Sequence, residues 1–401
     1  MKILKNLKPL ALSPTTIFLI ALTFTYIGST LQTGVFNNFA AEELKIRADQ
    51  LGIYESLRES PGIIAVFVIA LLMFLKEQYL AALATLLMAA GYFFYSRITE
   101  WHQLLLIGFI GSLGLHIHLP VSNAIAIFLA KENKQGQMLG RVQRFNFVGQ
   151  FISMAIIIIL GKKLSYRMAF VLSAISLLIA SVCYLSLPKN LGYIEKPKII
   201  VKKKYWVYYI LTFLEGCRKQ VFITFALFVL VKVYKMQIRY TAILMLFNAI
   251  MVIIFSPFIG YSIDRYGERR VLFISYFLVF FVFIGYAFFH NIWLLIACYT
   301  IDNILYLGSI SLTSYIGKLV PKNELRPTLS MGVTMNHIAA VAMPIIGGIL
   351  WEKLGYEVVF MIGAVIVIIS LVFIPFMKIE KRAQGESNTQ PSDPQSDALS
   401  N

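Results

Sequence analysis

The sequence predicts an all-α membrane protein with about twelve transmembrane helices, arranged as two pseudo-symmetric six-helix bundles. Of its 401 residues, 58% are hydrophobic and 14% are charged, and the mean hydropathy is +0.74. These values lie outside the range of soluble domains. A single water-soluble core cannot cover so much apolar surface, so most of that surface must face lipid. An internal repeat, described below, predicts the two bundles.

Apolar segments long enough to cross a bilayer follow one another along the chain. In the first half they lie at about 15–39, 57–75, 78–97, 101–129, 137–160 and 166–187. In the second half they lie at about 205–232, 239–262, 270–290, 292–317, 326–351 and 355–378. An amphipathic indole ring prefers the membrane interface. The four tryptophans, Trp101, Trp206, Trp293 and Trp351, lie at segment ends and support these boundaries.

These segments divide the chain into four parts. We expect an N-terminal six-helix bundle at 1–187, a basic cytoplasmic linker at 188–204 and a C-terminal six-helix bundle at 205–378. Residues 379–401 are rich in Ser, Gln, Asn, Pro and Asp, which predicts a disordered cytoplasmic tail. The first apolar segment is too long for a signal-peptide core, so we expect it to be retained as the first span.

The distribution of basic residues predicts the orientation. The net charge is +16, and the Lys and Arg clusters fall mainly in the loops that share a side with both termini. By the positive-inside rule this side is cytoplasmic, in a multi-pass protein of the cytoplasmic (inner) membrane. The basic residues are divided among short loops, which argues against nucleic acid as a partner. Cys183, Cys217 and Cys298 lie in apolar runs without metal spacing, so we expect no metal and no cofactor.

The two halves of the chain repeat each other in sequence. Residues 159–175 align with residues 349–365 at a shift of 190, with seven of seventeen positions identical. Residues 35–40 similarly match residues 221–226 at a shift of 186, and Trp101 matches Trp293 at a shift of 192. Corresponding spans of the two halves therefore match. Because each half has an even number of spans, both halves cross the membrane in the same direction.

The loop between the eighth and ninth segments carries a motif of glycines and charges. It reads Gly260-Tyr261-Ser262-Ile263-Asp264-Arg265-Tyr266-Gly267-Glu268-Arg269-Arg270 and is similar to the cytoplasmic loop motif GxxxDRxGxRR of the major facilitator superfamily. The chain resembles that family over residues 1–378. The resemblance implies that two rigid halves rock about a central site and expose it to each side of the membrane in turn.

By the same resemblance, the motif forms a gate made of Gly260, Asp264, Arg265, Gly267, Arg269 and Arg270. Asp264 is expected near Gly136–Arg141, where it would latch the halves together when the cytoplasmic side is shut. The alternative is an ordinary solvated turn. Two departures from the family argue against drug efflux: residues 74–78 lack the motif at the equivalent loop, and residues 149–152 do not fit the antiporter signature.

Polar groups at membrane depth are costly and therefore mark candidate sites. Glu215, Asp302 and His337 each lie about 15 Å from the nearer interface, judged by the rise of a helix. Arg218 follows Glu215 by one helical turn, so we expect these two side chains to pair. The set is flanked by Asn303 and Asn336. The alternative for each residue is a structural contact between helices.

The first half contributes a second group of candidates. It contains Arg141, Arg144, His116, His118, Gln32, Asn37 and Asn38, and Asn146 is the repeat counterpart of Asn336. Residues Glu55–Glu59 should open the second span on the outer side and line an entrance. Structural contacts between helices are again the alternative reading.

Together these features predict a secondary active transporter for a small organic solute. Glu215, Asp302 or His337 is expected to carry a coupled proton. If Arg144 and Arg218 face the cavity, an anionic or zwitterionic solute is favoured. A passive facilitator or channel of the same fold is an alternative. A membrane-embedded lipid-modifying enzyme is a weaker one, because no nucleophile-base or metal-ligand spacing is present. We expect the chain to act as a monomer, since the cavity lies within one chain.

Overall fold

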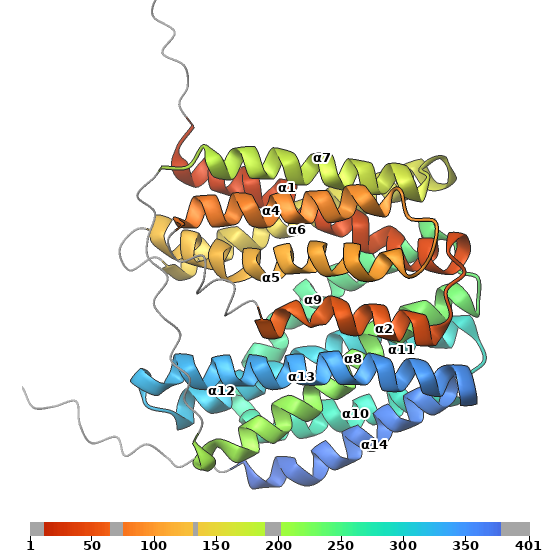
Figure 1. Ribbon diagram of the computed structural model, residues 1–401. Helices are drawn as coiled ribbons and strands as arrows, with labels where there is room; N and C mark the ends of the chain where they lie inside the picture. Colours follow the sequence, from red (N-terminus) through yellow and green to blue (C-terminus); the bar gives the residue numbers. More distant parts are fainter. Residues whose placement is uncertain (1–11, 65–74, 131–134, 189–201, 378–401) are drawn as a thin grey trace, which may run out of the picture.

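The computed structural model describes residues 12–64, 75–130, 135–188 and 202–377, which form helices joined by short connections. Two bundles of roughly parallel helices lie side by side (Figure 1). The predicted tail, 379–401, and most of the predicted linker, 188–204, lie outside the described residues. The predicted fold class, with twelve spans in two six-helix bundles, is confirmed.

The described residues of the first bundle include six helices. They are α1 (Pro14–Asn38), α2 (Ala48–Glu59), α4 (Glu77–Tyr95), α5 (Gln103–Leu129), α6 (Gln135–Leu160) and α7 (Tyr166–Leu185). The second bundle contains α8 (Trp206–Lys232), α9 (Ile238–Tyr266), α10 (Glu268–Phe288), α11 (Ile292–Leu305), α12 (Ile310–Leu319), α13 (Lys322–Leu354) and α14 (Tyr356–Phe373). A short 3-10 segment joins α11 to α12, so these two helices form one span.

Most of these helices have the length and composition of membrane spans. Among the described residues, ten helical segments are long and apolar enough to cross a bilayer. Their outer faces expose large apolar side chains such as Ile159, Phe258 and Trp293, as expected for surface in contact with lipid. The two remaining spans are α2 and α8. Glu215, Arg218 and Lys219 add charge to the middle of α8.

The main difference from the prediction is the start of the second span. The helix α2 begins at Ala48 rather than at about residue 57. Its first turn is polar, and hydropathy therefore does not detect it. The Gln50 side chain accepts a hydrogen bond from the Arg47 backbone N–H at 2.9 Å, and Asp49 lies in the first turn, where the helix dipole favours a negative charge.

The start of α1 and the end of α14 lie at one end of the molecule, at the left in Figure 1. We call this end the near end and the opposite end the far end. The connection between α9 and α10 is at the near end and consists of Gly267 alone, with φ 85°. The connection between α13 and α14 is at the far end and consists of Gly355 alone, with φ 93°. Glycine adopts these positive φ values without steric cost, so both turns can be this short.

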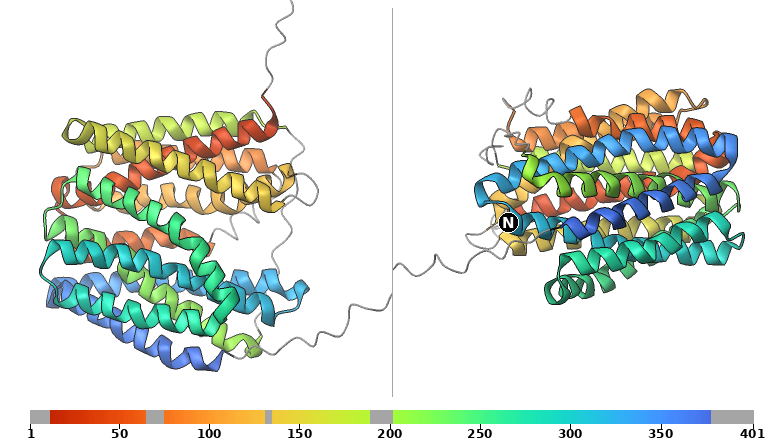
Figure 2. Two further views of the ribbon diagram at one scale, coloured as in Figure 1. Left: turned by 180° about the vertical axis from the view of Figure 1, so that it is seen from behind. Right: turned by 90° about the horizontal axis from the view of Figure 1, so that it is seen from below.

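The two bundles are joined through their far ends. The Asn38 side chain donates to the Met236 carbonyl at 2.9 Å, and the Ala48 backbone N–H donates to the Glu352 carboxylate at 2.7 Å. Lys232 also donates to the Ile46 carbonyl. Figure 2 shows the same bundles from behind and from below.

Glycines allow α2 and α13 to approach closely at the far end. A Cβ added at Gly52 would meet the Pro344 carbonyl, and one added at Gly348 would meet the Ala48 carbonyl. Small residues at helix crossings in membranes permit this backbone contact. At the near end, a Cβ added at Gly140 or Gly260 would meet nothing within 4 Å. The described structure is therefore a state in which the halves meet at the far end.

We predict that Gly348→Ala loosens the far end, because the added methyl group collides with backbone that cannot move aside. The reporter is a single cysteine, Ala48→Cys, in a chain whose three native cysteines are replaced by alanine; Ala48 is fully buried in the described state. Gly348→Ala should raise the rate of maleimide labelling at position 48 several-fold. The control is Gly317→Ala, since a Cβ there meets nothing within 4 Å. Equal labelling rates in both variants would contradict the prediction.

Candidate functional site

A charged pair is buried inside the second bundle. Arg218 of α8 donates from Nη1 to the Asp302 carboxylate of α11 at 2.9 Å. Both residues are buried, and the guanidinium carbon also lies 5.6 Å from the ring centres of Tyr276 and Tyr306. These aromatic faces stabilise the cation where water is excluded. The pair is therefore neutralised within one bundle.

This arrangement corrects the predicted pairing of Arg218 with Glu215. Glu215 instead accepts a hydrogen bond from the Asn336 amide at 2.6 Å, and the Asn336 oxygen lies 3.4 Å from the Lys219 ammonium. The second carboxylate oxygen of Glu215 is buried without a hydrogen-bond partner. Although Arg218 lies one turn from Glu215 on α8, the better-placed acid comes from a different helix. Sequence spacing along one helix cannot reveal such a partner.

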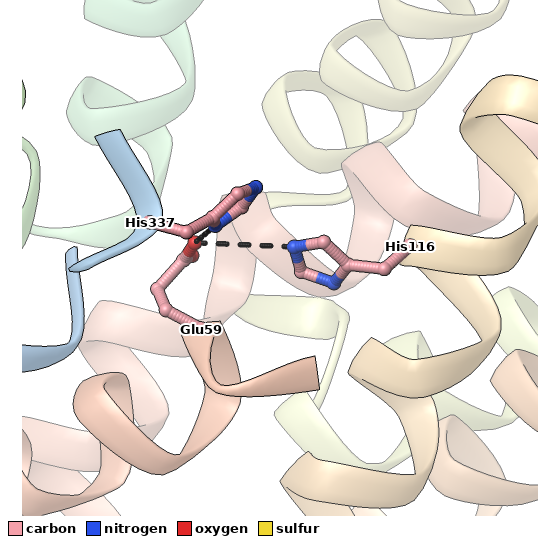
Figure 3. A group of neighbouring side chains, drawn as sticks. All are labelled: Glu59, His116 and His337. Carbon is pink, nitrogen blue, oxygen red and sulfur yellow. Dashed lines mark ion pairs between the residues drawn. The ribbon is translucent and has the colours of Figure 1, made fainter. Parts of the chain in front are cut away.

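A second cluster lies between the two bundles at mid-depth. Glu59 of α2, His116 of α5 and His337 of α13 converge, as Figure 3 shows. The Glu59 Oε2 atom is 3.7 Å from His337 Nδ1 and 4.0 Å from His116 Nε2. The two imidazole rings are 5.1 Å apart between centroids. Residues from both halves of the chain therefore meet at one point.

The early start of α2 places Glu59 in this cluster. Residues Glu55–Glu59, predicted to line an entrance on the outer side, instead form the last five positions of α2. Arg58 pairs at 2.7 Å with Glu55 and at 2.6 Å with Glu59. Counting from Ala48, Glu59 lies about 17 Å along the helix, which is near the middle of a bilayer. The prediction placed it at the surface because the polar first turns of α2 did not register as helix.

The other predicted site residues lie apart from these contacts. Asn303 donates to the Tyr299 carbonyl of its own helix at 2.8 Å, and His118 bonds to the Tyr184 hydroxyl at 2.8 Å inside the first bundle. Arg141 and Arg144 are exposed on the near-end half of α6, and Asn37 is half-buried near the end of α1. Their predicted binding roles remain predictions.

The glycine and charge motif lies at the near end and is mostly helical. Gly260, Asp264 and Arg265 belong to the last turns of α9, Gly267 makes the turn, and Arg269 and Arg270 begin α10. Asp264, Arg265, Arg269 and Arg270 are exposed in this state. Arg265 donates to the Tyr261 hydroxyl at 2.9 Å within α9. The buried neighbour Glu268 accepts from Ser314 at 2.6 Å and pairs with Lys318 at 2.5 Å.

The family profile described as Major Facilitator Superfamily matches residues 18–246 and again 208–399. The chain belongs to the major facilitator superfamily. The profile covers both halves, which agrees with the internal repeat and with the glycine and charge motif. This membership confirms the resemblance inferred from residues 260–270 and identifies the class of protein as a multi-pass membrane transporter. A search of curated proteins found no match.

Solved structures of this superfamily share the fold. A mutant of the nucleoside transporter NupG has a TM-score of 0.77 and 16% identity, covering 91% of this chain and 100% of its own. A bacterial homologue of the human lysosomal transporter Spinster, inward-facing and occupied, has a TM-score of 0.71 and 12% identity, covering 90% and 96%. A mutant of the peptide transporter POT in complex with sulfate has a TM-score of 0.69 and 15% identity, covering 90% and 94%. At these identities the likeness extends to the fold alone.

We predict that the Arg218–Asp302 pair contributes to stability only as a pair. Arg218→Met or Asp302→Leu leaves the opposite charge buried without its partner, which costs about 3–5 kcal/mol. Each single variant should therefore melt well below the wild type in detergent, whereas the double variant should recover most of the loss. Arg97→Met, at an exposed arginine, is the control and should melt like the wild type. A double variant less stable than both single variants would contradict this prediction.

Proposed function

We propose that this protein is a secondary active transporter that moves a small polar organic solute across the cytoplasmic membrane by alternating access, coupled to protons. The proposal is based on the contact between the two halves at the far end, together with the ionisable residues that both halves place at mid-depth. In this proposal the near end is cytoplasmic, as the basic loops indicate. The described state is then closed to the outside.

The side chains at mid-depth favour a solute that carries charge. Glu59 and His116 come from the first bundle, and Lys219, Asn336 and His337 come from the second. Lys219 is half-buried, and its ammonium makes a long contact of 3.4 Å to Asn336 and lies 5.9 Å from the centre of the Tyr306 ring. A solute carboxylate or phosphate would form a shorter, charge-assisted bond with it. An anionic or zwitterionic solute therefore fits best, with Lys219 taking the role first assigned to Arg218, which Asp302 already neutralises.

The structural relatives include transporters of nucleosides and of peptides. Both substrate types are polar, and peptides are zwitterionic. They therefore belong in a first screen beside organic acids, amino acids and sugar phosphates.

Among the predicted proton carriers, Glu215 is the best placed. Asp302 already has a partner of opposite charge, because Arg218 lies 2.9 Å from it. Glu215 has one buried oxygen without a partner and one hydrogen bond, from Asn336. Uptake of a proton on the unpartnered oxygen would remove a buried charge. Because Asn336 also contacts Lys219, protonation of Glu215 would change the groups that hold the solute.

The predicted latch belongs to the opposite state. Asp264 is exposed while the far end is shut, so it is available to contact the near-end start of α6 when the near end shuts instead. Such a contact stabilises one state selectively, and that differential interaction is what shifts the equilibrium between states.

We predict that the first ligand to stabilise the purified protein will be an anionic or zwitterionic solute. A thermal-shift screen of the wild type in detergent should give hits in this class, and Lys219→Ala should abolish them or weaken them by at least about tenfold. Glu100→Gln, at an exposed loop position, is the control. Hits restricted to cationic drugs would refute the substrate class, and anionic hits that survive Lys219→Ala would refute the role of Lys219.

We predict that Glu215→Gln separates solute movement from the proton gradient. Reconstituted wild-type protein should accumulate the solute when a pH gradient is imposed. The variant should exchange labelled for unlabelled solute but should not accumulate it, because a glutamine side chain cannot take up or release a proton. Gradient-driven accumulation by Glu215→Gln would exclude this residue as the proton carrier. If the wild type exchanges the solute but does not accumulate it, the passive facilitator is favoured.

We predict that Asp264→Asn disfavours the state closed at the near end. With the latch weakened, the far end should remain shut for longer, and maleimide labelling of Ala48→Cys should slow several-fold. Glu100→Gln should leave the labelling rate unchanged. An unchanged labelling rate in Asp264→Asn would instead support the alternative that residues 260–270 form an ordinary solvated turn.

A further inference from the structure

Glu59, His116 and His337 have the composition and spacing of a metal site. One ligand atom from each residue can be chosen so that all three lie within 4.8 Å of one another. A metal bound about 2.1 Å from each ligand requires ligand atoms about 3.0–3.5 Å apart. The distances of 3.7 and 4.0 Å from Glu59 Oε2 to the two imidazole nitrogens are close to this range. Small side-chain rotations would complete the geometry.

The surrounding groups orient these side chains toward a common point. His116 Nδ1 lies 2.9 Å from the Ser112 carbonyl oxygen, so this nitrogen carries the proton and Nε2 keeps its lone pair for the cluster. Metal-binding histidines are commonly oriented by such a bond to a backbone carbonyl. Arg58 holds Oε1 of Glu59 at 2.6 Å, which leaves Oε2 facing the imidazoles. His337 Nδ1 is buried without a hydrogen-bond partner.

We propose that Glu59, His116 and His337 form a binding site for a divalent transition-metal cation such as Zn²⁺ or Co²⁺. Two imidazole nitrogens and one carboxylate oxygen suit these borderline cations, whereas Mg²⁺ and Ca²⁺ prefer sites made of oxygen alone. Three protein ligands leave a coordination position open for water or for a ligand group of a solute.

The local charge favours a cation. Glu55 and Glu59 share the single guanidinium of Arg58, which leaves one net negative charge on this face of α2. Lys219 lies on the opposing helix α8, where its ammonium is 3.4 Å from the Asn336 oxygen, and its charge opposes cation binding. The expected affinity is therefore moderate. It should fall as the pH drops, because protons compete for the histidine nitrogens.

The metal site spans the two halves of the protein. Glu59 and His116 belong to the first bundle and His337 to the second, so the three ligands come together only when the far end is shut. A bound cation therefore holds the described state and opposes opening of the far end. This inference is independent of the proposed solute and of proton coupling, because the cation alone is the probe.

The first test is calorimetric titration of the full chain with Zn²⁺, and then with Co²⁺, after removal of any affinity tag that contains histidine. Because free cysteines also bind these ions, the three native cysteines are replaced by alanine. We expect one saturable site, with the Kd raised by at least about tenfold in Glu59→Gln, His116→Asn and His337→Asn. His102→Gln and His290→Gln alter exposed histidines and should bind as the parent does.

Either of two results would overturn the proposal. One is the absence of saturable binding to the parent protein, which is independent of whether any variant folds. The other is binding that persists in all three ligand variants while their melting temperatures match that of the parent. A failure to transport any solute would leave the metal titration unaffected, so the two proposals can fail separately.

The second test examines the link between the halves. Zn²⁺ should slow maleimide labelling of Ala48→Cys several-fold, because the far end must open to expose this position. Labelling of Lys163→Cys, at an exposed far-end position, should not change. The effect at position 48 should disappear in His337→Asn. If Zn²⁺ binds but leaves the labelling rate at position 48 unchanged, the site does not link the two halves and this part of the proposal is wrong.

Discussion

The structure depends on the high cost of leaving a charge uncompensated inside a membrane. Nine ionisable side chains from five helices of the described chain contact one another near mid-depth, and these contacts decide how the helices associate. They are Glu55, Arg58, Glu59, His116, Glu215, Arg218, Lys219, Asp302 and His337. Some of these charges are neutralised within one bundle and others face the opposite bundle, and this difference separates structural from functional candidates.

The Arg218–Asp302 pair belongs to the first kind. Both partners are buried in the second bundle, and two tyrosine rings flank the cation. Such a pair joins α8 to α11 and can stay unchanged while the halves move. Glu59, His116 and His337 belong to the second kind, because their separation depends on the position of one bundle relative to the other. Groups of this kind can couple a bound solute or ion to the state of the protein.

The two ends of the molecule are built differently. At the far end, Gly52 and Gly348 permit backbone contact between α2 and α13, and hydrogen bonds link the halves. At the near end, Asp264, Arg265, Arg269 and Arg270 are exposed. The described state therefore closes the far end by close packing and hydrogen bonds, whereas the latch proposed for the near end would use charged side chains.

The sequence alone determined the class of protein, the number of spans, the two-bundle repeat and the family. These properties follow from hydropathy and local motifs, which are readable because every span must be apolar over about 20 residues. It also identified Glu215, Arg218, Asp302 and His337 as ionisable residues at membrane depth. It misplaced the start of α2, since a polar first turn stabilised by Gln50 and Asp49 carries no hydropathy signal.

Only the tertiary structure decided which of these residues meet. Arg218 pairs with Asp302, 84 positions away, rather than with its helical neighbour Glu215. Glu59, His116 and His337 come from three helices, and no spacing along the chain connects them. Pairing between distant helices is set by how the bundles pack, because each helix can rotate to present a different face. Local sequence therefore fixes which polar groups lie at membrane depth, and packing chooses their partners.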